Sequence, residues 1–254
     1  MMRHKQIAST WFDTKRITAL RERSQSYSAK EDLWSWYVLR RLSIFVTILF
    51  IKLKLTPNAI SWLSAIFVVS SGAWLIQATP VAFLMAFLFY NIGYLLDCVD
   101  GEVARLTENT SKKGYFIDLL IQGATLPIFV SMILVIFILN DQLELTGLSG
   151  ITMYLAISGV IMSLFVPLAY QLTEKNQKVV RDPMNEIRTK SAVFEITGVL
   201  LGLPGFFLFI ASLSILNILM FIPVSIIKFY IMFFVLSLIG KTILRLYVTN
   251  KKLS

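Results

Sequence analysis

Residues 80–118 read PVAFLMAFLFYNIGYLLDCVDGEVARLTENTSKKGYFID. The first 17 residues of this stretch carry no charge, and a membrane-spanning helix needs about 20 mostly apolar residues. Acidic, small and basic residues follow, and Gly114 and Asp118 already belong to the next apolar run. The stretch therefore predicts the end of one membrane-spanning helix, a short basic loop and the start of the next helix.

The composition of the whole chain agrees with a membrane protein. Of its 254 residues, 56% are hydrophobic and only 15% are charged, and the mean hydropathy is +0.72. A water-soluble domain of this length would need a more polar surface. Backbone polar groups in hydrocarbon must be satisfied internally, so we expect an all-α, polytopic membrane protein. Residues 1–40 are polar and basic, so we expect no cleaved signal.

Six runs are long and apolar enough to span a bilayer, at residues 57–76, 80–104, 114–139, 148–172, 192–217 and 219–247. Lys and Arg occur before the first run, after the last, and in the connections that follow the second and fourth runs. The other three connections contain neither residue. Positive charge accumulates on the cytoplasmic side of membrane proteins. A multi-pass protein of the cell (inner) membrane, with a six-helix bundle and both termini in the cytoplasm, is therefore expected.

The chain divides into four segments by composition. Residues 1–31 form a polar, basic N-terminal tail, residues 56–248 the six-span membrane domain, and residues 249–254 a basic C-terminal tail. Residues 32–55 mix aromatic residues with arginines, which is typical of a juxtamembrane amphipathic helix lying among the lipid headgroups. A seventh span beginning near residue 42 is the alternative, but it would be too short to cross. Thr56 and Pro57 predict the N-cap and first residue of the first span.

Some classes of function are excluded by composition. Cys98 and His4 are the only residues of their types, so an internal disulfide, a typical zinc site and a histidine-based triad are not expected. The formal net charge is +9. Because the basic residues flank apolar spans, membrane topology and anionic headgroups explain this charge better than nucleic acid does.

The polar residues at the end of the second span share one helical face. Their spacing of i, i+3, i+4 and i+7 places them on one stripe. Two further residues, spaced i and i+4, begin the next span, and a short loop makes the two helix ends antiparallel neighbours. We expect the following side chains to converge at the cytoplasmic end of the bundle: Asp97, Asp100, Gly101, Ala104, Gly114 and Asp118.

Converging carboxylates repel one another and are costly near hydrocarbon. Pairing with Arg105 or protonation would relieve that cost, and so would binding of Mg²⁺ or Mn²⁺, for which carboxylate oxygens are suitable ligands. The small residues on the same stripe leave room for a ligand against the backbone, which favours the second explanation. We therefore predict metal ligands at Asp97, Asp100 and Asp118.

This spacing resembles the motif of the CDP-alcohol phosphotransferases (the CDP-alcohol phosphatidyltransferase family), D-x2-D-G-x2-A-R-x8-G-x3-D-x3-D. Seven of its eight positions match, at Asp97, Asp100, Gly101, Ala104, Arg105, Gly114 and Asp118. The resemblance implies an acceptor that attacks the phosphorus of a CDP-linked donor, release of CMP, two bound Mg²⁺ or Mn²⁺ ions and a homodimer. It also implies donor binding by these residues. Asn58 and Ser61 of the first span are further candidates for nucleotide contacts, although helix capping and packing explain them as well. A lipid, polyol or phosphate acceptor in phospholipid or glycolipid biosynthesis would fit.

The eighth position is Gln122, where the family has a fourth aspartate that acts as general base. Activity without this base has two explanations: the acceptor is one that needs no base, such as a phosphate, or another group takes the proton, with Asp118, Glu102 and metal-bound hydroxide as candidates. The alternatives are a pseudoenzyme that binds CDP compounds without turnover, and an engineered Asp→Gln change. An active, divergent transferase with Asp118, Gln122 and Arg105 at the reaction centre is the favoured hypothesis.

A cation transporter is the rival from a different class, because intramembrane acids can line an ion path. The acids here cluster at one end of the bundle, which argues against a continuous path. Further cationic contacts to an anionic substrate are possible at Lys113, Arg181 and Arg188, although topology alone also accounts for them. Lys228 lies inside the sixth span and is expected to pack in the bundle or snorkel.

Overall fold

The computed structural model describes residues 7–26, 33–141 and 200–253, with single residues and runs of two or three between 147 and 198. In this part of the chain the secondary structure is entirely helical, as predicted. The helices are α1 (Lys15–Gln25), the π-helix η2 (Ser35–Leu39), α2 (Arg40–Lys52), α3 (Pro57–Leu75), α4 (Pro80–Leu106), α5 (Lys112–Ala124), α6 (Leu126–Ile138), α10 (Leu203–Ile218) and α11 (Val224–Leu253).

Local sequence explains where the helices begin. The side chains of Thr56, Thr79 and Ser111 each accept a hydrogen bond from a backbone N–H in the first turn of α3, α4 and α5. Such caps satisfy donors that have no partner within the helix. Pro127 lies in the first turn of α6. Because proline cannot continue a helix, the predicted span 114–139 is divided into α5 and α6.

Within the described residues, three helical segments are long and apolar enough to cross a membrane: Pro57–Leu75, Pro80–Leu106 and Lys112–Ile138. They agree with the first three predicted spans. Two shorter apolar helices, Leu203–Ile218 and Val224–Gly240, fall within the last two. Of the fifth predicted span, 192–217, most residues before 200 lie outside the described part of the chain, and α10 begins at Leu203, after an extended Gly202. Most of the predicted span 148–172, together with Arg181 and Arg188, lies outside the described residues.

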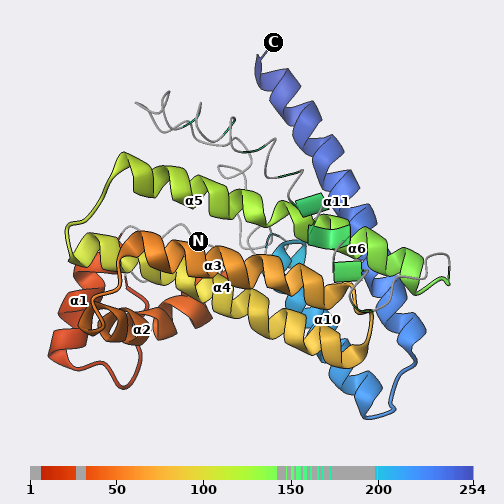
Figure 1. Ribbon diagram of the computed structural model, residues 1–254, viewed down its shortest axis with the longest axis horizontal. Coiled ribbons are helices and arrows are strands. Elements are labelled where there is room, and N and C mark those ends of the chain that lie inside the picture. The colour runs from red at the N-terminus through yellow and green to blue at the C-terminus, as the bar shows by residue number, and fades with distance from the viewer. Residues whose placement is uncertain are drawn as a thin grey trace.

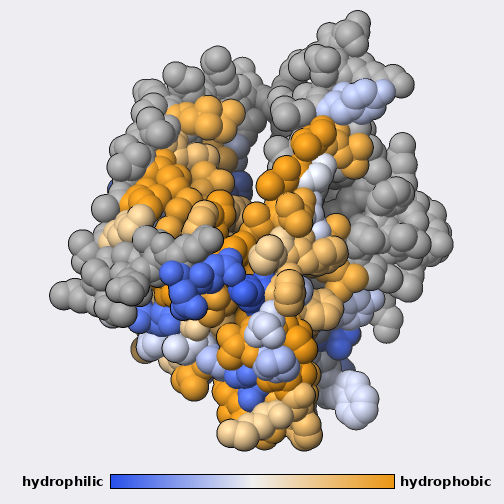
Figure 2. All heavy atoms as spheres, turned by 90° about the vertical axis from the view of Figure 1, so that its right-hand side faces the viewer, coloured by the Kyte–Doolittle hydropathy of each residue, from blue (hydrophilic) through white to orange (hydrophobic). Residues whose placement is uncertain are grey.

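The arrangement places the acidic motif at one end of the bundle. Figure 1 shows α3, α4 and α5 running along the longest axis, with α1 and α2 beside the end of α4 and α10 and α11 toward the other end. Helices α3 and α4 pack closely, and α5 packs mainly on α3. On the face shown in Figure 2, apolar side chains cover most of the coloured surface. A surface of this kind suits lipid as the solvent.

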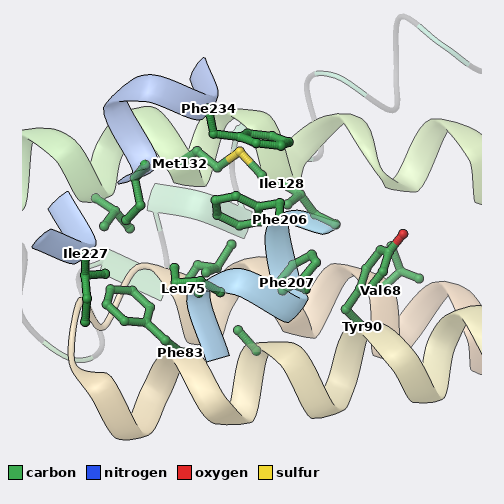
Figure 3. Close-up of a cluster of buried hydrophobic side chains, with 14 of the residues drawn as sticks. Val68, Leu75, Phe83, Tyr90, Ile128, Met132, Phe206, Phe207, Ile227 and Phe234 are labelled. Atoms are coloured by element: carbon green, nitrogen blue, oxygen red, sulfur yellow. The ribbon is translucent and has the colours of Figure 1, made fainter. Parts of the chain in front are cut away.

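The largest apolar core joins α3, α4, α6, α10 and α11, and its side chains interdigitate in Figure 3. Its aromatic rings contact one another: Tyr90 stacks on Phe207 with ring centroids 4.3 Å apart, and Phe206 packs at a tilt against Phe234 with centroids 4.8 Å apart. A smaller core lies nearer the acidic motif and consists of Ile60, Leu96, Val99 and Val103, with partly buried side chains of α2 packed on it. These cores fix the register of α4 against its neighbours.

The segment before α3 is helical from η2 through α2, and its two faces differ in polarity. Arg40, Ser43 and Thr47 are buried, whereas Leu42, Leu49 and other large apolar side chains of α2 are exposed. The spacing of i, i+3 and i+7 puts the three polar residues on one stripe. The polar face of α2 therefore points into the protein, and its apolar face points away from it.

Candidate active site

Asp100 is the most buried of the predicted metal ligands, with 8% of its surface exposed. It sits near the end of α4, where the smaller apolar core begins. The hydroxyl of Ser61, on the second turn of α3, donates a hydrogen bond to Asp100 Oδ2. This contact fixes the carboxylate and joins α3 to α4 at the motif.

Asp118, on α5, is half-buried and lies near enough to Asp100 for the two carboxylates to interact electrostatically. The structure thus brings acids from two different helices toward one another. It does so differently from the expectation, because α5 packs mainly on α3 rather than on α4. The connecting loop contains Glu108 in the left-handed region, with φ of 55°. This turn allows α5 to leave the end of α4 and follow α3.

Gln122 follows Asp118 by one turn and is exposed. Its amide Nε2 donates to Asp118 Oδ2 over 3.4 Å. An amide cannot act as a base near neutral pH, but it can orient a neighbouring carboxylate. Gln122 is therefore placed to position Asp118.

Two predicted small residues have different surroundings. At Gly101, an added Cβ would lie 3.2 Å from Arg105 Nη1 and 3.3 Å from Nη2. The space predicted to receive a ligand there is thus filled by the Arg105 guanidinium, which also interacts with Asp100. At Gly114, an added Cβ would lie 3.7 Å from Asn58 Oδ1. That distance is ordinary contact, and it brings the starts of α3 and α5 together.

The predicted metal ligands can be tested by their donor chemistry. Asp97 is half-buried and lies one turn before Asp100 on α4, with Ala104 one turn after it. Among the described residues, no three His, Cys, Asp or Glu side chains already form a group that could hold a metal. Carboxylate oxygens are nevertheless the ligands that Mg²⁺ and Mn²⁺ prefer. The donor type fits such an ion, and Asp100 with Asp118 is the pair that the geometry supports best.

Glu102, one of the alternative bases, is fully buried. Its Oε1 accepts hydrogen bonds from Gln25 Nε2 at 2.9 Å, Arg40 Nη1 at 3.1 Å and Ser43 Oγ at 2.5 Å, and Oε2 accepts from Thr47 Oγ1 at 2.8 Å. Its carboxylate is thus engaged by α1 and α2. The polar stripe of α2 was the sequence signal that could have identified these partners.

Helix α1 was missed by the sequence analysis, which predicted only a polar tail. Arg21 is fully buried and forms an ion pair with Asp13, with Nε and Oδ2 2.8 Å apart. Its two Nη atoms donate to the carbonyl oxygens of Arg40 and Arg41 at 2.8 and 2.9 Å. Burial acts to raise the pKa of Asp13, but hydrogen bonds from Arg21 and Thr10 outweigh it and hold that pKa below its ordinary value.

An apolar cavity of about 400 Å³ lies between α3 and α5. Ile117 and Ile121, which flank Asp118 in the sequence, line it together with Trp62, Ala65 and other apolar side chains. Lys228, in contrast, donates to Asn140 Oδ1 at 2.9 Å, beyond the end of α6. The predicted packing role of Lys228 fits this contact.

Comparison with known proteins gives one match. The family model described as CDP-alcohol phosphatidyltransferase matches residues 54–246, which is most of the chain and includes every predicted site residue. No curated protein and no solved structure gives a significant match. Helices α1 and α2 precede the matched range. On this evidence the chain belongs to the CDP-alcohol phosphatidyltransferase family.

Proposed function

We propose that this protein is a membrane enzyme that transfers a substituted phosphate group from a CDP-linked donor to an alcohol or phosphate acceptor, with release of CMP. The observation that carries the proposal is the proximity of Asp100 and Asp118, from α4 and α5, within the range matched by the family. Two acids brought together from separate helices beside Arg105 suit an anionic substrate with a divalent cation.

The proposed setting is the cytoplasmic face of the cell membrane. The alternation of basic connections supports six spans and cytoplasmic termini. The exposed apolar face of α2 supports a juxtamembrane helix, residues 32–55, whose outer side contacts lipid. The membrane domain would then comprise residues 56–248, between the basic tails 1–31 and 249–254. A homodimer, suggested by the family resemblance, belongs to the same proposal.

Each site residue has a proposed task. Asp97, Asp100 and Asp118 would hold the divalent ions, with Ser61 fixing the orientation of Asp100. When bound, such ions polarise phosphoryl oxygens and offset charge that develops during displacement. Arg105 would bind the donor phosphates. Ala104, Gly114 and Asn58 would lie along the cytidine nucleotide, and Gly101 would leave room for the Arg105 guanidinium against α4.

Gln122 is proposed to position Asp118 rather than to take a proton. The supporting observation is the hydrogen bond from its amide to Asp118 Oδ2. The acceptor proton would then pass to Asp118, or an anionic acceptor would need no base.

One of the two substrates is proposed to be a lipid. The cavity between α3 and α5 is lined by Ile117, the neighbour of Asp118 in the sequence, and by other side chains that, apart from Ser70, are apolar. A cavity of this kind suits an acyl or isoprenoid chain, because burial of apolar surface stabilises the complex.

The test is CMP release by the purified protein from a panel of CDP-linked donors, with Mg²⁺, with Mn²⁺ and with a chelator. The site variant is Asp100→Asn, and its matched control is Asp141→Asn, which changes an exposed acid beyond α6. Metal-dependent release that Asp100→Asn abolishes and Asp141→Asn retains would support the proposal. Binding of CDP donors without release would indicate a pseudoenzyme. Neither binding nor release across the panel would contradict the proposal and favour a transporter.

A further inference from the structure

Helix α1 contacts the motif end of α4 through two specific hydrogen bonds. Gln25 Nε2 donates to Glu102 Oε1 over 2.9 Å. Arg105 Nε donates to the backbone carbonyl oxygen of Ser24 over 2.5 Å. Both partners on α4 lie within the motif stretch: Glu102 directly follows Gly101, and Arg105 is the arginine of the motif. The C-terminal end of α1 therefore contacts α4 at two residues of the proposed active-site motif.

These contacts belong to a buried polar network rather than to loose surface packing. Ser24, Gln25 and Glu102 are all fully buried. Gln25 is bonded at both ends, since its amide nitrogen also donates to the Arg40 carbonyl at 2.9 Å and its oxygen accepts from Arg21 at 3.3 Å. A buried network whose members have partners fixes one arrangement of its helices. Helix α1 thus packs on α2 and α4 in one defined position.

The position of α1 determines the orientation of the Arg105 side chain. The last carbonyl groups of a helix carry partial negative charge and attract cations. The Ser24 carbonyl, near the end of α1, takes the Nε–H of Arg105. Both Nη atoms then lie over Gly101, on the side of α4 that interacts with Asp100. The guanidinium is held at Nε, and its Nη1 and Nη2 lie beside Gly101, the residue next to Asp100.

We propose that α1 is a positioning element of the active site, in which Ser24 and Gln25 hold Arg105 in the orientation that binds the substrate phosphate. The inference rests on the proposed function, because it assigns the phosphate contact to Arg105. The helix precedes the residues matched by the family, 54–246. It is therefore an addition to the matched domain that acts on one of the motif residues.

The test uses the full chain with CMP and Mg²⁺ as the probe, and calorimetry to measure the dissociation constant. Gln25→Glu places a second carboxylate against Glu102 and should release α1, seen as faster backbone hydrogen exchange in residues 15–25. We expect the Kd for CMP to rise about 3- to 10-fold, and the Kd for cytidine, which lacks the phosphate, to stay unchanged. Ala19→Glu, which adds the same charge at an exposed position of α1, should change neither.

Two further variants separate positioning from folding. Gln25→Glu/Glu102→Gln removes the repulsion and should restore both the protection of α1 and the affinity for CMP. In an Arg105→Ala background, Gln25→Glu should have no further effect on CMP, because contacts that act through one residue are not additive. If Gln25→Glu leaves α1 protected, Arg21→Ala, which removes the buried link to α2, releases it instead.

The outcomes distinguish this inference from the proposed function. Release of α1 with unchanged or tighter binding of CMP would overturn the inference alone. Equal weakening of CMP and cytidine, without rescue by the double variant, would also overturn it and indicate a structural role. A wild-type protein that binds no CMP would defeat the proposed function and this inference together.

Discussion

Gln122 donates the N–H of its side-chain amide to the carboxylate of Asp118, with Nε2 and Oδ2 3.4 Å apart across one turn of α5. Gln122, at the position where the sequence resemblance implies a fourth aspartate, thus contacts Asp118, the aspartate one turn before it. The hydrogen bond indicates that Gln122 positions the Asp118 carboxylate.

Gln122→Ala should lower kcat for CMP release about 3- to 10-fold, because Asp118 loses one hydrogen-bond donor. Gln122→Asp should not exceed the wild-type rate, since a second carboxylate would repel Asp118. Steady-state kinetics on both variants measures the effect. A rise in kcat of about 100-fold or more in Gln122→Asp would contradict the positioning role and show that glutamine is a defect in the general base.

Ser61→Ala should raise the Mg²⁺ concentration needed for half-maximal activity about 10- to 100-fold. The hydroxyl of Ser61 orients Asp100, and loss of such outer contacts commonly weakens metal binding by that factor. The matched control is Ser71→Ala, because Ser71 is also buried on α3 but bonds only the carbonyl of Val68 in its own helix. An equal shift in both variants would argue against a specific role for Ser61.

Glu102→Ala should lower the free energy of unfolding by about 3–5 kcal/mol. Its carboxylate is fully buried and pairs with Arg40, and removal of one partner leaves a buried charge uncompensated. Thermal unfolding in detergent, compared with the exposed Glu108→Ala, provides the measurement. Equal melting temperatures for the two variants would mean that the network around Glu102 does not stabilise the protein.

Docking of α1 should weaken in acid through Asp13. Hydrogen bonds hold its pKa in the folded protein below the ordinary value of 3.8. A carboxyl group with a lowered folded pKa stabilises the folded state above its unfolded pKa and loses that contribution as pH falls through the folded pKa. We expect protection of α1 from hydrogen exchange to be constant near neutral pH and to decline below about pH 4.

Asp13→Asn is the control for this pH dependence. The variant should show weaker protection of α1 at neutral pH, because the ion pair with Arg21 is lost, and a shallower decline in acid. An identical acid profile in the variant and the wild type would assign the transition to another group.

Ala65→Phe should raise KM for a long-chain lipid substrate about tenfold and leave KM for a short-chain analogue nearly unchanged. Ala65 lines the apolar cavity between α3 and α5, and a larger side chain would occupy the volume proposed for the hydrocarbon chain. Val81→Phe, at a position that is 61% exposed, is the matched control. Equal effects on long and short substrates would indicate that the cavity does not hold the chain.

Several features of this protein follow from sequence alone. The apolar lengths, the caps at Thr56 and Thr79 and the prolines after them determined where α3 and α4 begin. The spacing of Asp97 and Asp100 placed both acids on one face of α4, because a helix repeats every 3.6 residues. These properties depend on residues close together in the chain, so local physical chemistry is sufficient to predict them.

The tertiary structure decided the rest. In the folded protein Glu102 contacts the polar stripe of α2, and α5 packs on α3. The Arg105 side chain lies over Gly101, and α1 packs on α4. Gln25 and Glu102 are 77 positions apart, and a pairing at that separation has no local signal in a single sequence. It is fixed only when burial of whole helices brings the two polar groups together and leaves each without water as an alternative partner.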